Sequence, residues 1–210
     1  MGGRGASSGT DKGRPNAATE YYVSGDGMWI NSYLRGNEAI GELTESERQY
    51  LRDLDTATDA PIKDKELYRS VDASAIFGPM QDGDYENLFT YLAYGPDAWG
   101  KGEYARGLSN SVADMIRKAE GKTITEKGFM STTSERSVAE QWGGFSGSER
   151  PVVLEIKTSP NTKGVNLSSY DKNVDADQAQ HERLLKRGQS YKVGKVEYKN
   201  GNIYISVTMK

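Results

Sequence analysis

The chain has 210 residues, a formal net charge of −3 and no cysteine. That length suits one domain with a sizeable core, and a weakly acidic protein gains no general attraction to nucleic acid or to an anionic membrane. The lack of cysteine excludes disulfides and thiolate chemistry. With His181 as the single histidine, we expect no metal site.

Residues 1–20 are rich in glycine, serine, threonine and asparagine. They lack the apolar core of a signal peptide, and their composition predicts a flexible arm. Nothing in residues 21–210 resembles a linker, so we expect a single domain there. No stretch approaches the roughly 18 apolar residues of a membrane span, so no membrane partner is expected.

The first half of the chain predicts four helices, from capping residues and from apolar side chains at helical spacing. The first three begin at Asp26, at the Thr44–Glu47 capping box and at Asp84. The first helix is expected to end at Gly36, the second before Pro61, the third at Gly95-Pro96 and the fourth at Gly121.

The second half predicts strands. Residues 151–158 form a β-rich run, and residues 195–209 form a hairpin across Asn200-Gly201, a strong turn signal. Two further strands are expected at residues 65–71 and 127–133. Helices followed by antiparallel strands indicate an α+β fold.

Arg69 shares a strand face with Leu67 and Val71 by alternation. An arginine on an apolar face is costly unless an anion meets it. A bound phosphate would serve, and so would a neighbouring carboxylate. Taken alone, Arg69 is best interpreted as a strand-end residue in a salt bridge.

Two other polar segments are weak signals by themselves. Ser131-Thr132-Thr133 ends a predicted strand, where hydroxyl residues are common. In residues 180–185, strand alternation would place Gln180 and Glu182 on one face, one offering an amide and the other a carboxylate. The simpler interpretation is a solvent-facing strand edge.

The order of these segments changes the interpretation. Leu-Tyr-Arg-Ser at 67–70 is followed by Gly-Phe-Met-Ser-Thr-Thr at 128–133 and by Gln-x-Glu at 180–182. An Ile-Asn-x-x-Leu-Arg segment at 30–35 precedes them, and an Ile/Thr/Met-rich strand at 203–209 follows. This series resembles the Arg–Ser-Thr-Ser–Gln-x-Glu class of bacterial ADP-ribosyltransferase toxins, especially the clostridial exoenzymes that modify Rho GTPases.

The resemblance implies an ADP-ribosyltransferase fold: two packed antiparallel sheets with an N-terminal helical layer, with residues 21–210 as the catalytic domain. It implies a mono-ADP-ribosyltransferase that cleaves NAD and needs no metal. Glu182 would stabilise the cationic ribose that forms when nicotinamide leaves. Ser131 would hydrogen-bond Glu182, and Arg69 would hold the NAD diphosphate or position Glu182.

Further NAD contacts are implied by the same resemblance. Arg35 is a second candidate for the phosphates, and Asn31 belongs to the segment that precedes the arginine motif. Between Ser134 and Pro151 lies the family's phosphate–nicotinamide loop, in which Trp142 and Arg150 match the aromatic and the arginine. Packing of Trp142 in the core is an equal alternative. Ser134 would cap a short helix that ends at Gly143-Gly144.

The acceptor is expected to be a macromolecule. In such toxins Gln at position 180 goes with amide acceptors, here a protein asparagine or glutamine, and a Gln-x-Glu pair also occurs in relatives that modify DNA guanine. The turn 175–179 is acidic and lacks the aromatic residue that the family uses to dock its target, so the resemblance leaves recognition of Rho open.

The sequence leaves three alternative functions open: an NAD glycohydrolase, a DNA-guanine transferase, or an inactive phage structural module of the same fold. The opening Gly-Gly-Arg-Gly-Ala-Ser-Ser-Gly is similar to transferase domains encoded by phages. We expect a monomer. It would lie in the cytoplasm of the producing or infected cell, or be delivered as a secreted effector.

Overall fold

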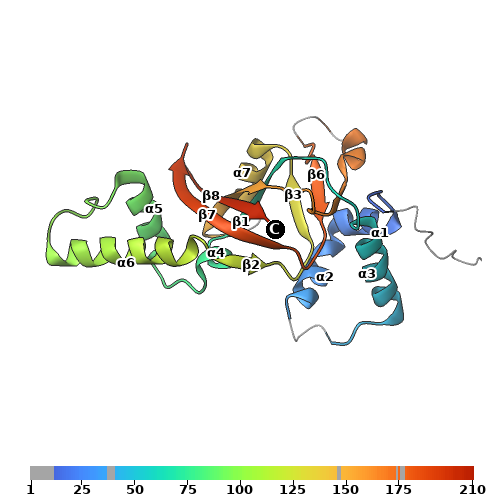
Figure 1. Ribbon diagram of the computed structural model, residues 1–210, viewed down its shortest axis with the longest axis horizontal. Coiled ribbons are helices and arrows are strands. Elements are labelled where there is room, and N and C mark those ends of the chain that lie inside the picture. Colours follow the sequence, from blue (N-terminus) through green and yellow to red (C-terminus); the bar gives the residue numbers. More distant parts are fainter. Residues whose placement is uncertain (1–11, 37–40, 146–147, 174, 176–177) are drawn as a thin grey trace, which may run out of the picture. The chain divides into compact units, whose positions relative to one another are not determined.

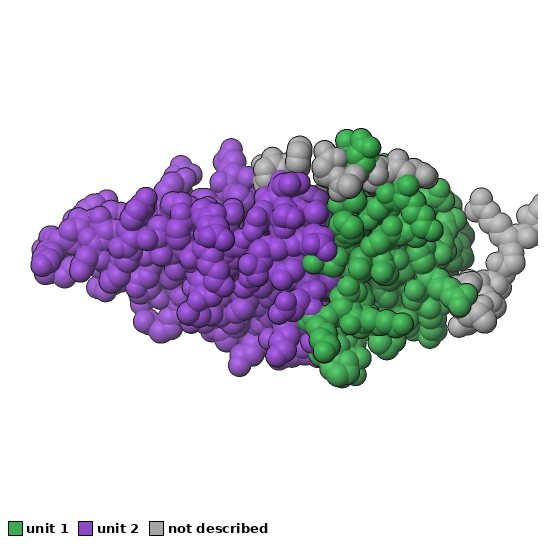
Figure 2. Space-filling view, turned by 90° about the horizontal axis from the view of Figure 1, so that it is seen from above, with its two compact units in different colours: residues 1–65, 125–134, 159–189 green, residues 66–124, 135–158, 190–210 purple. Residues whose placement is uncertain are grey.

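The computed structural model describes residues 12–36, 41–145, 148–173, 175 and 178–210. They divide into two compact units, coloured separately in Figure 2. Unit 1 contains residues 1–65, 125–134 and 159–189, and unit 2 contains 66–124, 135–158 and 190–210. Each unit is therefore assembled from three separate stretches of chain. The phage-like opening of the sequence lies outside the described residues.

The helices of unit 1 come mainly from its N-terminal stretch (Figure 1). They are α1 Ala17–Tyr21, the π-helical turn η1 Tyr22–Asp26, α2 Gly27–Leu34, α3 Glu45–Ala57 and the 3-10 helix η2 Ser168–Asn173. Asn16 and Thr19 form a capping box, so α1 begins inside the segment predicted as an arm. The predicted box of Thr44 and Glu47 at α3 is confirmed.

Three short strands complete unit 1: β3 Met130–Thr133, β5 Gly164–Asn166 and β6 Glu182–Leu185. Strand β6 pairs antiparallel with β3 on one side and with β5 on the other. The strand predicted at 127–133 is thus present but starts three residues later.

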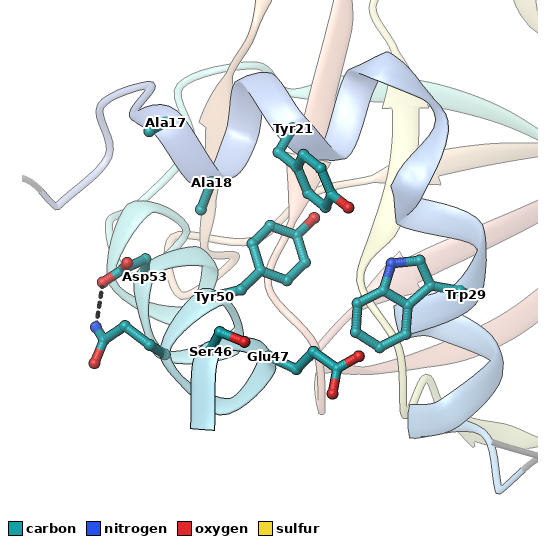
Figure 3. A pocket seen from close by; sticks show the side chains of 9 residues that line it. Ala17, Ala18, Tyr21, Trp29, Ser46, Glu47, Tyr50 and Asp53 are labelled. Carbon is teal, nitrogen blue, oxygen red and sulfur yellow. Dashed lines mark hydrogen bonds between the residues drawn. The ribbon is translucent and has the colours of Figure 1, made fainter. Parts of the chain in front are cut away.

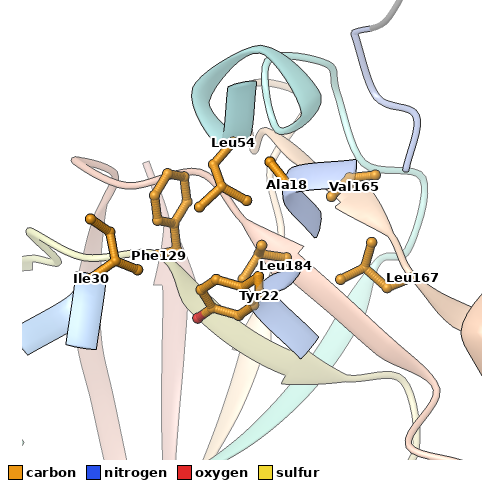
Figure 4. Close-up of a cluster of buried hydrophobic side chains, with 8 residues drawn as sticks. All are labelled: Ala18, Tyr22, Ile30, Leu54, Phe129, Val165, Leu167 and Leu184. Atoms are coloured by element: carbon orange, nitrogen blue, oxygen red, sulfur yellow. The ribbon is translucent and has the colours of Figure 1, made fainter. Parts of the chain in front are cut away.

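An apolar cluster joins the helices of unit 1 to its strands (Figure 4). Its buried members are Ala18, Tyr22, Ile30, Leu54, Phe129, Val165, Leu167 and Leu184. Burying one large apolar side chain contributes about 1.5–3 kcal/mol. This cluster therefore packs α1, α2 and α3 against β5, β6 and the residue that leads into β3. Strands β3 and β6 carry two of the predicted site motifs.

Unit 2 holds five strands in the order β2-β7-β8-β4-β1. Their bounds are β1 Glu66–Asp72, β2 Thr123–Thr125, β4 Pro151–Lys157, β7 Ser190–Lys199 and β8 Asn202–Met209. The expectation of purely antiparallel strands is wrong in one place, because β4 and β8 pair parallel. The β7–β8 turn sets those two strands antiparallel, and β8, not β7, lies beside β4.

The predicted hairpin turn is confirmed. Asn200 and Gly201 both have positive φ, 50° and 87°, as the favoured two-residue hairpin turn requires. Strand β7 begins at Ser190, earlier than the predicted residue 195, and its register shifts between Val193 and Val196.

The helices of unit 2 are α4 Ser74–Phe77, α5 Asp84–Tyr94, α6 Glu103–Ala119 and α7 Arg136–Phe145. Asp84 is the first residue of α5 and not its cap, because Gly83 occupies that place with φ 86°. The prediction that Ser134 caps a helix ending at Gly143-Gly144 is wrong, since α7 begins at Arg136 and continues to Phe145. In the described part of the chain, no helix has the length and apolarity to cross a membrane.

Candidate active site

Strands β3 and β6 place Ser131 and Glu182 on one face of unit 1. Thr133 lies opposite Glu182 and Ser131 lies opposite Leu184. Directly opposed residues of an antiparallel pair share a face, and so do residues two apart on one strand. Glu182 is buried, with 8% of its surface exposed. The acid predicted to be catalytic and the hydroxyl predicted to support it therefore share a face.

A chain of hydrogen bonds ties Ser131 to the N-terminal helices. The Tyr22 hydroxyl lies 3.2 Å from Ser131 Oγ and accepts a bond of 2.8 Å from Asn31 Nδ2. At its other end, Asn31 Oδ1 accepts the Phe129 N–H at 2.8 Å. Asn31 thus uses both ends of its amide to fix α2 against β3, and its contact with NAD stays a prediction.

Arg35 lies just beyond the end of α2. Its Nε is 3.0 Å from Glu126 Oε1, an atom that also accepts the Gly128 N–H. The Arg35 side chain is 42% exposed. The ion pair therefore orients the guanidinium while leaving part of it accessible to an anion such as phosphate.

Gln180 lies outside β6, so the prediction that it shares a strand face with Glu182 is wrong. The strand begins at Glu182, and His181 before it has φ 46°, a left-handed conformation that breaks strand alternation. Asp171 holds this bend, since its carboxylate accepts the N–H of Gln180 at 3.1 Å and of His181 at 2.9 Å. Gln180 is exposed.

Arg183 supports β6 from the opposite face, where it lies opposite Thr132. Only 9% of Arg183 is exposed, and its guanidinium binds Asp64 at 3.0 Å, the Ser168 hydroxyl at 2.6 Å and the His181 carbonyl at 2.9 Å. A buried charge is tolerable when paired and hydrogen-bonded in this way. These bonds help to hold the bend that leads into Glu182.

Three supporting residues were missed from the sequence: Tyr22, Asp171 and Arg183. Tyr22 and Arg183 bind partners far away in the chain, and Asp171 accepts backbone N–H groups nine and ten residues later, so no local pattern identifies these roles. The turn 175–179 lies only partly within the described residues, because Ala176 and Asp177 fall outside them.

Arg69 belongs to unit 2, at the centre of β1 and opposite Leu154 of β4. Its neighbour Tyr68 faces α7, where the Arg136 guanidinium lies 5.3 Å from the Tyr68 ring centre. Since successive strand residues point to opposite faces, Arg69 points away from α7, on the face of Leu67 and Val71 as predicted. Arg69 is half-buried.

Trp142 and Arg150 also belong to unit 2. Trp142 lies on α7 and is half-buried. Arg150 Nε lies 3.6 Å from Asp72 Oδ2. Burial works to raise the pKa of Asp72, but hydrogen bonds from Ser74 and Ser148 and the charge of Arg150 outweigh it and hold that pKa below its ordinary value. Arg150 thus already has an anionic partner.

Comparisons with known proteins confirm the resemblance to bacterial ADP-ribosyltransferase toxins. A family model described as ADP-ribosyltransferase exoenzyme matches residues 14–210. Among curated proteins, no match is found. Several solved structures share the fold.

Three of those structures illustrate the likeness. An ADP-ribosyltransferase from Clostridium botulinum is 23% identical, with a TM-score of 0.58 over 91% of this chain and 84% of that one. The larvin toxin from Paenibacillus larvae, also an ADP-ribosyltransferase, is 21% identical, with 0.56 over 92% and 85%. A protein from S. aureus, solved with NAD, is 20% identical, with 0.60 over 95% and 89%.

Proposed function

Because the chain belongs to the ADP-ribosyltransferase exoenzyme family, and is therefore an NAD-dependent mono-ADP-ribosyltransferase, we propose that Glu182 drives transfer of ADP-ribose to a protein asparagine or glutamine side chain. One observation carries the proposal: Glu182 is buried at the start of β6, on the same face as Ser131. A carboxylate held in that setting, in its ionised form, can stabilise a developing cation without reorganising during the reaction.

The reaction breaks the bond between nicotinamide and the ribose. Nicotinamide leaves as a neutral molecule with the bonding electron pair, so no general acid is required. The ribose becomes an oxocarbenium-like cation, which the Glu182 carboxylate stabilises. The acceptor nitrogen then bonds to the anomeric carbon and loses a proton to the solvent.

The remaining predicted residues bind and orient NAD in this proposal. Arg69 and Arg35 contact the diphosphate, because a guanidinium suits phosphate oxygens. Ser131, held by Tyr22, hydrogen-bonds Glu182. Trp142 and Arg150 contact the nicotinamide end and the phosphates, with Arg150 shared between NAD and Asp72.

Gln180 selects the acceptor in this proposal. Gln180 stands two residues before Glu182 and has an exposed side chain. Its backbone N–H is held by the Asp171 carboxylate. A side-chain amide both donates and accepts hydrogen bonds, so it can align another amide. It does not take up a proton at neutral pH, which suits an acceptor that needs positioning more than deprotonation.

The test uses labelled NAD with bacterial and eukaryotic lysates, and measures nicotinamide release and label in protein and in nucleic acid. We expect labelled protein with wild type and none with Glu182→Gln. Nicotinamide release without labelled macromolecule would identify a glycohydrolase instead, and labelled DNA a guanine transferase. No release at all would indicate an inactive module.

A further inference from the structure

Unit 1 carries a pocket of about 670 Å³ walled by α1, α2 and α3 (Figure 3). None of the unit 1 residues placed above in the active site lines it. A volume of this size is typical of sites that hold a small molecule or a side chain. The pocket is therefore a second concave site whose role the transfer reaction does not explain.

Three aromatic side chains give the pocket its apolar walls: Tyr21 from α1, Trp29 from α2 and Tyr50 from α3. The Trp29 and Tyr50 rings are stacked at 6.2 Å, and Tyr21 meets Tyr50 edge-on at 5.2 Å. Trp29 and Tyr50 also pack against the buried cluster of unit 1. The Trp29 and Tyr50 rings are thus held in place by the core before any ligand arrives, and Tyr21 is held by its edge-on contact with Tyr50.

The charged residues among the described lining are both acidic. Glu47 and Asp53 project from α3 six residues apart, with Gln49 between them in the chain and Ser46 directly before Glu47. Hydrogen bonds from the Thr44 hydroxyl and N–H lower the pKa of Glu47, so this carboxylate is ionised at neutral pH. Aromatic faces beside carboxylates attract an organic cation by two independent effects.

The polar atoms decide which cation fits. A guanidinium is planar, stacks on aromatic rings and carries five N–H donors that carboxylate, amide and hydroxyl oxygens can accept. A quaternary ammonium has no donor, so it could not hydrogen-bond the carboxylates of Glu47 and Asp53, whose bonds from Thr44 and Gln49 each engage one oxygen. A lysine ammonium donates hydrogen bonds but does not stack as a planar group. The lining of rings and two carboxylates matches the guanidinium, whereas the Gln49 amide oxygen is already engaged by the Arg52 side chain.

We infer that this pocket binds an arginine side chain presented by a protein partner of the enzyme. The site holds the partner and does not modify it, because Glu182 is not among the lining residues. The inference is independent of the acceptor proposed for Gln180, so either can fail without the other.

The experiment titrates the enzyme with the peptide acetyl-Gly-Arg-Gly-amide and follows the indole N–H signals by NMR. The chain has three tryptophans, so Trp99 and Trp142 serve as internal references for Trp29. Matched peptides carry citrulline or lysine in place of arginine, and tetramethylammonium is the fourth probe. We expect a saturable shift of Trp29 with arginine, weaker binding of lysine, and none with citrulline.

The test variant is Glu47→Gln with Asp53→Asn. Glutamine preserves the capping box with Thr44, and asparagine keeps an acceptor for Gln49, so the fold is retained while both charges are lost. We expect arginine binding to weaken by about tenfold or more, the loss expected from removing two nearby charges. Glu45→Gln is the matched control, because Glu45 lies on α3 but does not line the pocket.

Three results would overturn the inference. Equal binding of the citrulline peptide would show that charge is not recognised. Tetramethylammonium binding at least as tightly as arginine would indicate a choline-type site. A loss of binding in Glu45→Gln as large as in the double variant would show a general charge effect and not a built pocket.

Discussion

The Tyr22 hydroxyl lies 3.2 Å from Ser131 Oγ, which joins the turn after α1 to the strand that carries the Ser-Thr-Thr motif. The same hydroxyl oxygen accepts the Asn31 side-chain N–H. Since a hydroxyl has one hydrogen to give and Asn31 supplies its own, Tyr22 can donate to Ser131. In that arrangement Ser131 Oγ accepts the bond from Tyr22, and the hydroxyl hydrogen of Ser131 is available to another acceptor.

We predict that Tyr22→Phe lowers the free energy of unfolding by about 1–3 kcal/mol, because it leaves the buried Asn31 amide without its acceptor. Urea unfolding of both proteins measures the change. Tyr104→Phe is the control, since Tyr104 is 79% exposed and its loss of a hydroxyl should be nearly neutral. An equal effect of the two substitutions would contradict the role of Tyr22.

Glu182→Gln should reduce turnover by about 10²–10³-fold or more, because the transition state loses a fixed charge. NAD affinity and thermal stability should change little, since glutamine has nearly the same shape. Nicotinamide release and NAD binding, measured on the same preparation, separate the two effects. If turnover survives while binding is lost, Glu182 holds NAD and another group stabilises the cation.

Asp171→Ala should reduce transfer to the target more than it reduces NAD hydrolysis. The substitution removes the acceptor for the Gln180 and His181 N–H groups, so the exposed Gln180 is no longer held before Glu182. The comparison is with Gln180→Ala, which should show the same imbalance, and with Lys172→Ala at the exposed neighbouring position. Equal loss of both activities in Asp171→Ala would place Asp171 in support of the NAD site.

The ion pairs of Asp59 lead us to predict that the stability of the fold depends on pH. Its carboxylate accepts hydrogen bonds from Lys12, Lys163 and Lys186, which hold its pKa well below the ordinary value. Because the pKa is lowered on folding, this stabilisation is complete above the ordinary pKa of about 4 and is lost as the pH falls towards the folded pKa.

The stability difference between wild type and Asp59→Asn should therefore be largest near neutral pH and should shrink below about pH 4. Denaturant unfolding across that range provides the measurement. Asp114→Asn, on the solvent side of α6 with half of its side chain exposed, is the control. A difference that stays constant with pH would show that the lysines do not act through the charge of Asp59.

Features with local causes were predictable from the sequence. The Thr44–Glu47 box and the Asn200-Gly201 turn depend on residues close together in the chain, and both are present. The pairing of β4 with β8 depends on distant segments, so its parallel direction was not predicted.

The site shows the same division. Motif order predicted Glu182 and Ser131 as site residues, and the register of β3 and β6 places them on one face. The position of Gln180 was wrong because the left-handed His181 is held by Asp171, ten residues earlier, and by the carbonyl bond to Arg183. The alternation of side chains along a single strand does not reveal such contacts between distant residues.

The assembly of unit 1 from three stretches has a consequence for synthesis of the chain. Ala18, Ile30 and Leu54 emerge from the ribosome first, but the side chains that cover them, Phe129 and Leu184, come much later. The N-terminal helices must therefore keep apolar surface uncovered until β6 has been made. Folding that depends on such distant contacts is slow and exposed to aggregation, which makes this stretch a natural client for chaperones.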